Sequence, residues 1–291
     1  MEKFSNAVTL LRIPFSVFLM PIFWFAFIHV EWNEASLINA IVVFLILHLL
    51  VYPASNGYNS YCDKDEESIG GLEKPPVVNE YLIYLVVAFD ILAVVCSVFL
   101  NLSFAIAILA YLLVSKAYSW PTIRLKKFPI ASTAIVTLFQ GAFTYYMVVL
   151  GIEGSFEWST NYVLPAIVST LFLAGSYPIT QIYQHSEDGR RGDRTLSIML
   201  GIKGTFFFAA TMFVLASVLM AYWLQDLIAI GIYFVVTAPV GMFFSKWMLN
   251  SLKNREAVNF SNTMRMNKIS SLCMSATFVL IKVYLELFAV Q

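Results

Sequence analysis

The sequence predicts an all-α membrane protein, with nine transmembrane helices in one bundle that takes in the single domain 1–291. Hydrophobic residues make up 59% of the chain and charged residues only 12%, whereas a soluble domain has about 25% charged residues. The apolar residues form runs of roughly twenty, the length that a helix needs to cross a hydrocarbon core of about 30 Å. The polar connections between these runs alternate between basic and non-basic.

Each run is apolar on all sides, which suits a helix whose backbone polar groups must all be paired inside the membrane. We expect the spans at residues 10–30, 36–58, 80–100, 102–121, 129–151, 161–184, 204–224, 227–245 and 268–288.

Basic residues occupy every second connection. They are Lys64 and Lys74; Arg124, Lys126 and Lys127; Arg190, Arg191, Arg194 and Lys203; and Lys246, Lys253, Arg255, Arg265 and Lys268. The other connections, around 31–35, 101, 152–160 and 225–226, contain no Lys or Arg. The positive-inside rule then predicts a multi-pass protein of the cell (inner) membrane with a cytoplasmic N-terminus. An odd number of spans places the C-terminus outside.

Composition indicates little else about partners beyond the lipid bilayer. The formal net charge is zero, and we expect no nucleic-acid partner. Cys62, Cys96 and Cys273 lack the spacing of a disulfide framework or a zinc site.

The first acidic loop, about 59–79, follows the second span. Asn59, Asp63 and Glu67 are spaced i, i+4 and i+8, so they stack on one face, about 6 Å apart, if the helix continues. Such oxygen donors suit Mg²⁺, which is commonly shared with substrate phosphates. Lys74 could then hold a phosphate oxygen. The alternative is a solvated acidic loop without a ligand.

The second acidic loop, about 184–203, follows the sixth span. Gln184 and Asp188 repeat the i, i+4 spacing, and Glu187 and Asp193 flank them. The arginines that follow are donors of the kind that bind phosphate. The two loops therefore predict a paired metal and phosphate site on one side of the membrane.

These motifs resemble the UbiA superfamily of intramembrane prenyltransferases. "NSYCDKDEE" (59–67) is similar to the first Asp-rich motif of that family, and "DGRRGDRTLSIMLG" (188–201) is similar to the second. "AYSWPTIRLKK" (117–127) resembles the segment after the fourth helix, and "LLRIPFS" (10–16) resembles the start of the first. Two residues depart from the family pattern: Glu67 replaces an Asp, and Gln184 replaces an Asp with an uncharged amide, for which Glu187 could compensate.

The resemblance implies Mg²⁺-dependent transfer of an isoprenyl group from an isoprenyl diphosphate to a lipophilic, typically aromatic, acceptor. It implies catalytic roles for Asp63 and Asp188. The implied metal ligands are Asn59, Asp63, Glu67, Gln184, Glu187 and Asp188. The implied diphosphate-binding residues are Lys74, Arg124, Lys126, Arg194, Tyr118 and Tyr183. Two alternatives are a carrier of an anionic lipid or metabolite, and a family member that has lost catalysis.

Three polar residues within the spans have two interpretations each. Asp90 is either a general base for the acceptor or a carboxyl group bonded to a neighbouring helix. Arg12 either extends to the membrane surface or reaches the diphosphate. Gln140 either lines a cavity or lies where helices pack closely.

Overall fold

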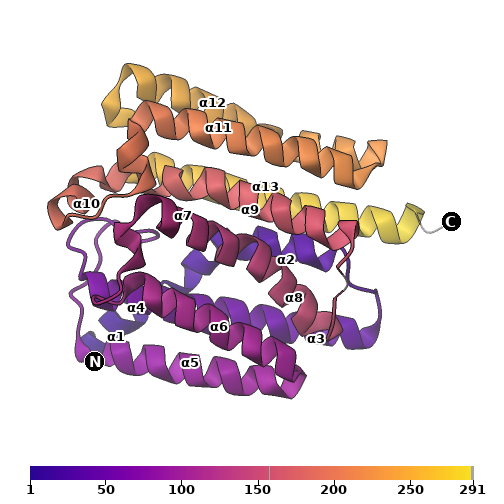
Figure 1. Cartoon of the computed structure of the whole chain (residues 1–291), viewed down its shortest axis with the longest axis horizontal. Helices are drawn as coiled ribbons and strands as arrows, with labels where there is room; N and C mark the ends of the chain where they lie inside the picture. Colours follow the sequence, from indigo (N-terminus) through magenta and orange to yellow (C-terminus); the bar gives the residue numbers. More distant parts are fainter. Residues whose placement is uncertain (157, 290–291) are drawn as a thin grey trace.

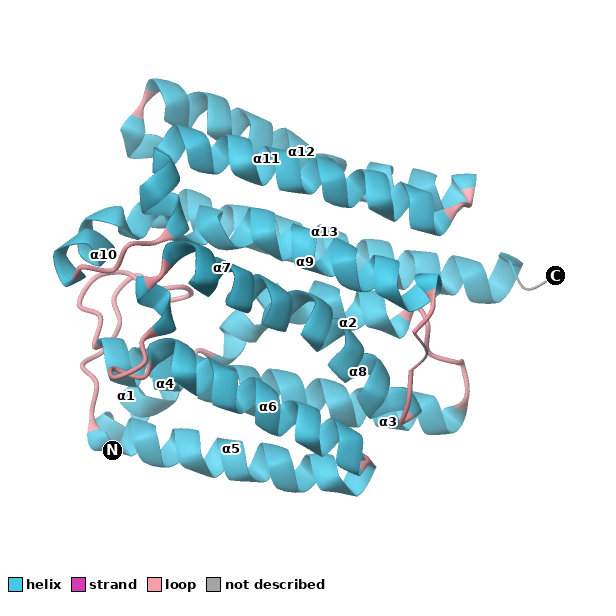
Figure 2. Cartoon of the chain, in the orientation of Figure 1, coloured by secondary structure: helices cyan, strands magenta, loops and turns pink. Residues whose placement is uncertain are grey.

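The computed structural model describes residues 1–156 and 158–289, and this part of the chain contains nine helical spans long and apolar enough to cross a membrane. The prediction of an all-helical membrane bundle is confirmed (Figures 1 and 2). The first five spans comprise α1 (Glu2–Leu10), η1 (Ile13–Leu19) and α2 (Met20–Phe27); α3 (Glu34–Leu45), η2 (Ile46–Val51) and α4 (Tyr52–Asp63); α5 (Glu80–Leu100); α6 (Leu102–Ser119); and α7 (Pro129–Leu138), η4 (Phe139–Phe143) and α8 (Thr144–Glu153). The remaining spans comprise α9 (Thr160–Gln181), η5 (Ile182–Gln184) and α10 (His185–Arg191); α11 (Leu196–Leu224); α12 (Leu227–Lys253); and α13 (Phe260–Tyr284) with η7 (Leu285–Ala289). Two short 3₁₀ turns, η3 (Leu125–Lys127) and η6 (Arg255–Ala257), lie in the connections.

Several helices extend beyond the apolar runs, because polar side chains cap them. The side chain of Thr195 accepts a hydrogen bond from the backbone N–H of Ile198 at the start of α11, and Asn259 caps α13 in the same way. The expected span at 204–224 begins just after Gly201, where a positive φ of 63° kinks α11. The apolar runs therefore mark the membrane-crossing part of each helix rather than its ends.

The helices run roughly along one axis and pack mainly with neighbours in space. Close pairs include α9 with α11, α12 with α13, and α4 with both α5 and α6. Figure 1 places the N-terminus and α10 at one end of the bundle and the C-terminus at the other. The two termini thus lie at opposite ends of the bundle, as an odd number of spans requires.

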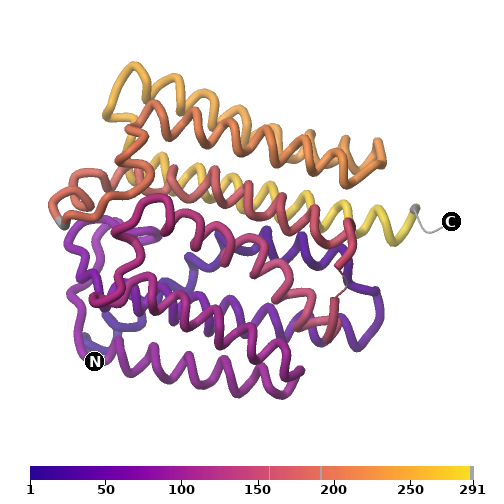
Figure 3. The backbone as a smooth tube through the Cα atoms, viewed as in Figure 1, coloured from indigo at the N-terminus to yellow at the C-terminus, as the bar shows by residue number. Residues whose placement is uncertain are grey.

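Breaks in three spans shape the interior of the bundle. Arg12 adopts a left-handed conformation between α1 and η1. The second and fifth spans each contain a π-helical segment, η2 and η4, and the chain runs continuously through η4 into α8 (Figure 3). π-Helical segments are frequent at functional sites, because they redirect side chains within a helix.

Candidate active site

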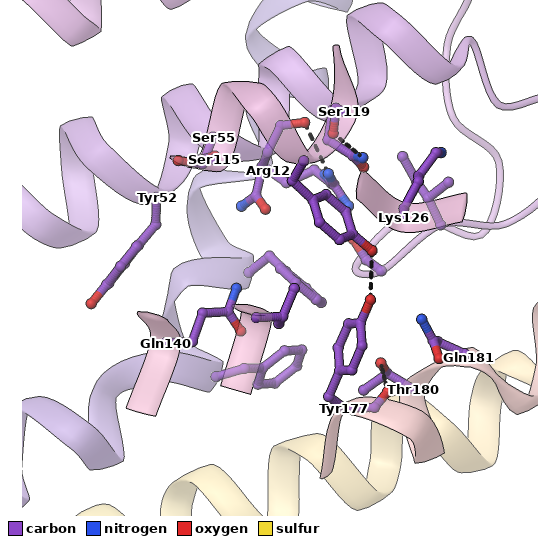
Figure 4. A pocket seen from close by; sticks show the side chains of 18 of the residues that line it. Arg12, Tyr52, Ser55, Ser115, Ser119, Lys126, Gln140, Tyr177, Thr180 and Gln181 are labelled. Carbon is purple, nitrogen blue, oxygen red and sulfur yellow. Dashed lines mark hydrogen bonds between the residues drawn. The ribbon is translucent and has the colours of Figure 1, made fainter. Parts of the chain in front are cut away.

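A cavity of about 340 Å³ lies between η1, α4, α6, η4 and α9, with the two acidic loops at its polar end. Its apolar part is lined by Phe18, Leu19, Val136, Phe139 and Leu173, with Tyr52, Tyr111 and Gln140 among them. Phe15 also lines the cavity but packs against Arg12 and Gly70 at the first acidic loop. In Figure 4, Lys126 and Gln181 lie on one side of this cavity, and Tyr52 and Gln140 lie on the opposite side. Of the two interpretations of Gln140, the one in which it lines a cavity agrees with the structure.

Asn59 and Asp63 lie one turn apart at the C-terminal end of α4, where the first acidic loop begins. The amide nitrogen of Asn59 donates hydrogen bonds to Asp63 Oδ2 at 2.8 Å and to Ser119 Oγ at 2.9 Å. Both Asn59 and Asp63 line the cavity. The end of an apolar helix thus carries two oxygen-bearing side chains, one turn apart, into the polar end of the cavity.

The placement of Glu67 corrects one expectation. The α4 helix ends at Asp63, and the left-handed Lys64 (φ 52°) turns the chain away. The helix therefore does not continue to Glu67, which does not share a helical face with Asn59 and Asp63. Glu67 is exposed, forms an ion pair with Arg190, and is not among the residues that line the cavity. Asp65, which lies outside the i, i+4, i+8 spacing of Asn59, Asp63 and Glu67, lines the cavity instead.

The second acidic loop reaches the same cavity from the end of α9. Gln184 and Asp188 both line it, and the side-chain nitrogen of Gln184 donates to the carbonyl of Ser68 at 3.1 Å. This hydrogen bond joins the two loops directly. Glu187 is buried but is not among the residues that line the cavity. At this loop Gln184 and Asp188 line the cavity, and compensation by Glu187 stays a prediction.

Gln181 is a cavity residue that the sequence analysis missed. It precedes Gln184 by one helical turn, and its Oε1 is buried with no hydrogen-bond partner in the described part of the chain. Buried polar atoms without partners are rare and call for an explanation such as a ligand or an ion. The i, i+3 spacing of the two glutamines was the available signal.

A buried ion-pair network connects the acidic loops to the segment after α6. Lys126 Nζ lies 2.5 Å from Asp63 Oδ1 and 3.4 Å from Asp193 Oδ2. Arg124 holds Asp193 with two hydrogen bonds, Nε to Oδ1 at 3.0 Å and Nη2 to Oδ2 at 2.8 Å. Burial would raise the pKa of Asp193, but the hydrogen bonds and charges of Arg124 and Lys126 outweigh burial and hold that pKa below its usual value. The hydrogen bonds to Asp193 likewise raise the pKa of Arg124.

The basic residues divide into those at the cavity and those outside it. Lys126 lines the cavity, whereas Arg124 does not and instead holds Asp193. Lys74 and Arg194 are exposed and are also outside the set of cavity-lining residues. The structure thus brings one of the four expected diphosphate-binding cations to the cavity.

Arg12 supplies a second cation at the cavity. Its guanidinium is buried and donates to the carbonyls of Gly70 at 3.2 Å and Asn56 at 2.9 Å. Its Nε has no hydrogen-bond partner in the described regions. Of the two interpretations of Arg12, extension to the membrane surface does not hold, because the side chain turns inward to the cavity.

The tyrosines beside the loops take the expected positions. Tyr118 and Tyr183 both line the cavity, and the Tyr118 hydroxyl lies 2.5 Å from that of Tyr177. Asp90 lies elsewhere: its Oδ1 and Oδ2 are 3.0 Å and 2.9 Å from Lys116 Nζ, and neither residue lines the cavity. This geometry agrees with the interpretation of Asp90 as a carboxyl group bonded to a neighbouring helix.

Within residues 1–156 and 158–289, no three His, Cys, Asp or Glu side chains are grouped closely enough to hold a metal ion. The cavity instead combines the carboxylates of Asp63, Asp65 and Asp188 with amide side chains. A cation bound here would need amide oxygens, water or oxygens of a second ligand to complete its coordination.

Comparison with known proteins identifies the class of this bundle. A profile of the UbiA prenyltransferase family matches residues 18–269. The chain therefore belongs to the UbiA prenyltransferase family.

Solved structures of the same fold cover nearly the whole chain. A UbiA homologue from Archaeoglobus fulgidus bound to GPP and Mg²⁺ has a TM-score of 0.67 at 17% identity, over 96% of this chain and 99% of that one. An apo UbiA homologue from Aeropyrum pernix K1 has a TM-score of 0.69 at 18% identity, over 92% and 98%. A digeranylgeranylglyceryl phosphate synthase has a TM-score of 0.59 at 19% identity, over 97% and 98%. No curated protein sequence matches the chain.

Proposed function

We propose that this chain is a Mg²⁺-dependent prenyltransferase that moves an isoprenyl group from an isoprenyl diphosphate to a lipophilic, aromatic acceptor within the membrane. The observation that carries the proposal is that Asp63 and Asp188, from loops far apart in the sequence, line one cavity together with Lys126. The family match supports the reaction class, and the Archaeoglobus fulgidus homologue bound to GPP and Mg²⁺ supports the donor and the ion.

The donor atoms at the polar end fit a hard cation. Asn59, Asp63, Asp65, Gln184 and Asp188 offer oxygen and no sulfur or imidazole, and Mg²⁺ prefers oxygen ligands while keeping several waters. The unpartnered Oε1 of Gln181 adds one more oxygen. When bound, Mg²⁺ would neutralise the charge that grows on the leaving diphosphate. We assign Asp63 and Asp188 to the metal, with Asp65 in place of Glu67.

Cations and hydroxyl groups at the same end suit the diphosphate. Lys126 and Arg12 line the cavity, and the paired hydroxyls of Tyr118 and Tyr177 lie nearby. Because Lys74 and Arg194 are exposed outside the cavity, we assign neither to the diphosphate. Arg124 acts through Asp193 as a positioning residue.

The apolar part of the cavity suits the isoprenyl chain and protects the reacting carbon. Phe18 and Phe139 line this part. A ring face stabilises a desolvated cation by about 2 kcal/mol or more, and an apolar wall excludes the water that would otherwise capture it. The acceptor would reach the allylic carbon from this water-poor side.

We place the protein in the cell (inner) membrane with this site facing the cytoplasm. The support is the basic character of the connections beside the acidic loops. Figure 1 shows that α10 and the N-terminus share one end of the bundle, so both would lie on the cytoplasmic side.

The test is prenyl transfer in membranes of expressing cells, which supply lipophilic acceptors. Labelled geranyl diphosphate with Mg²⁺ should give diphosphate and a labelled lipid, and EDTA should abolish both. Asp63→Ala should lower the rate at least ~100-fold. Glu67→Gln, which alters an exposed carboxylate of the same loop, is the matched control and should retain the rate.

Two outcomes would contradict the proposal. If Asp63→Ala kept the wild-type rate, Asp63 would not be a ligand of the catalytic metal. Uptake of intact donor without its cleavage would favour the carrier alternative.

A further inference from the structure

Lys126 forms an ion pair with Asp63, the carboxylate that the proposed function assigns to the metal. Its ammonium lies 2.5 Å from Asp63 Oδ1, while Asp63 Oδ2 accepts a hydrogen bond from the amide nitrogen of Asn59 at 2.8 Å. Both oxygens of this carboxylate are therefore engaged by side chains of the chain itself. The Asp63 side chain is 5% exposed and that of Lys126 is 12% exposed, so solvent screens their attraction only weakly.

The backbone of Lys126 is anchored independently of its ammonium, which is held by ion pairs to Asp63 and Asp193. Arg124, in a left-handed conformation, begins the η3 turn that carries Lys126. The bidentate bond from Arg124 to Asp193 anchors this turn to the second acidic loop. The long, flexible Lys126 side chain can then exchange Asp63 for another anion in the same cavity without movement of the backbone.

We propose that Lys126 is the residue that couples metal binding to diphosphate binding, because its ammonium and a divalent cation compete for Asp63. This inference rests on the proposed function. A metal that takes Asp63 releases the ammonium, and a diphosphate gives that ammonium a new anionic partner. Each ligand therefore makes the other easier to bind, and the coupling is reciprocal by thermodynamic linkage.

The most direct readout is the affinity of the protein for a divalent metal in the absence of diphosphate. Mn²⁺, counted by its electron paramagnetic resonance signal, serves as the probe, with purified full-length protein and no diphosphate present. Lys126→Met removes the competing ammonium and keeps most of the aliphatic stem. We expect it to bind Mn²⁺ about tenfold more tightly than the wild type, within the usual range of such couplings.

Lys127→Met is the matched control. Lys127 is the next residue of the same turn, is exposed, and is not among the residues that line the cavity. A general loss of positive charge would tighten Mn²⁺ binding equally in both variants, whereas direct competition affects only Lys126→Met.

A second measurement uses the wild-type protein and does not depend on the folding of a variant. Acylation of lysines, followed by mass spectrometry, should show Lys126 becoming more reactive when Mg²⁺ is added, with Lys127 unchanged. Equal Mn²⁺ affinities in wild type and Lys126→Met, or no change in Lys126 reactivity with Mg²⁺, would overturn the coupling and leave the proposed function standing. Absence of Mn²⁺ binding in all the proteins, with geranyl diphosphate present as well as without it, would overturn both.

Discussion

At the scale of single residues, Asp193 illustrates how a side chain outside the predicted ligand set organises the site. Its carboxylate is 3% exposed and contacts both Arg124 and Lys126. These contacts join the segment after α6 to the second acidic loop. The sequence contained both arginine and aspartate but gave no reason to pair them, because they lie on different connections.

We expect Asp193→Asn to destabilise the protein by about 3 kcal/mol, because removal of one partner leaves the charge of the other uncompensated. Thermal unfolding in detergent measures this effect. Glu67→Gln breaks an exposed ion pair with Arg190 and should cost under about 1 kcal/mol. A similar loss of stability in the two variants would contradict the view that the contacts of Asp193 stabilise the fold more than an exposed ion pair does.

The same variant should reveal a dependence on pH. The folded chain holds the pKa of Asp193 below its usual value, which is about 3.9 in the unfolded chain. Ionised Asp193 therefore contributes stability above about pH 4, and this contribution is lost as the pH falls through the folded pKa. The difference in unfolding temperature between wild type and Asp193→Asn should be full near neutral pH and shrink below about pH 4. A constant difference would mean that the charge of Asp193 is not what stabilises the contact.

At the scale of helices, the sequence predicted the existence of the nine spans but not the breaks within them. Long apolar runs have no other stable form in a membrane, so composition was sufficient for the spans. The π-helical segments η2 (ILHLLV) and η4 (FQGAF) lie within long apolar runs, and no periodicity distinguishes them. In η4 a tertiary contact supports the break: the N–H of Ala142 donates to Thr170 Oγ1 at 3.1 Å.

The close packing of η4 on α9 gives a testable consequence. A Cβ added at Gly141 would lie 2.7 Å from Thr170 Cα and 2.8 Å from Thr170 N, both backbone atoms that cannot move aside cheaply. Gly141→Ala should therefore destabilise the protein by about 1–3 kcal/mol. Gly231→Ala is the control, because an added Cβ there meets nothing within 4 Å. Equal unfolding temperatures for the two variants would contradict this packing.

At the scale of the whole molecule, the alternation of charged connections predicted that the two acidic loops share one side of the membrane. It could not predict which side chains reach the cavity, because this depends on where α4 ends. The left-handed turn at Lys64 sends Glu67 outward and leaves Asp65 at the cavity. Arg12 reaches the cavity from a helix break within the "LLRIPFS" motif, and Gln181 reaches it from a helix end that no motif marks.

The orientation of the bundle can be tested with reporter fusions. We expect alkaline phosphatase fused to the C-terminus to be active, because this end should lie outside the cytoplasm. A fusion after Lys253 should be inactive, since it ends in a basic connection. An inactive C-terminal fusion together with an active fusion after Lys253 would show that the bundle has the opposite orientation.

The most direct test of the shared cavity is equilibrium binding of tritiated geranyl diphosphate to the purified protein. We expect binding that requires Mg²⁺, disappears with EDTA, and is lost in both Asp63→Ala and Asp188→Ala but retained in Glu67→Gln. Binding that persists in EDTA and in both aspartate variants would show that the two loops do not form one metal-dependent diphosphate site.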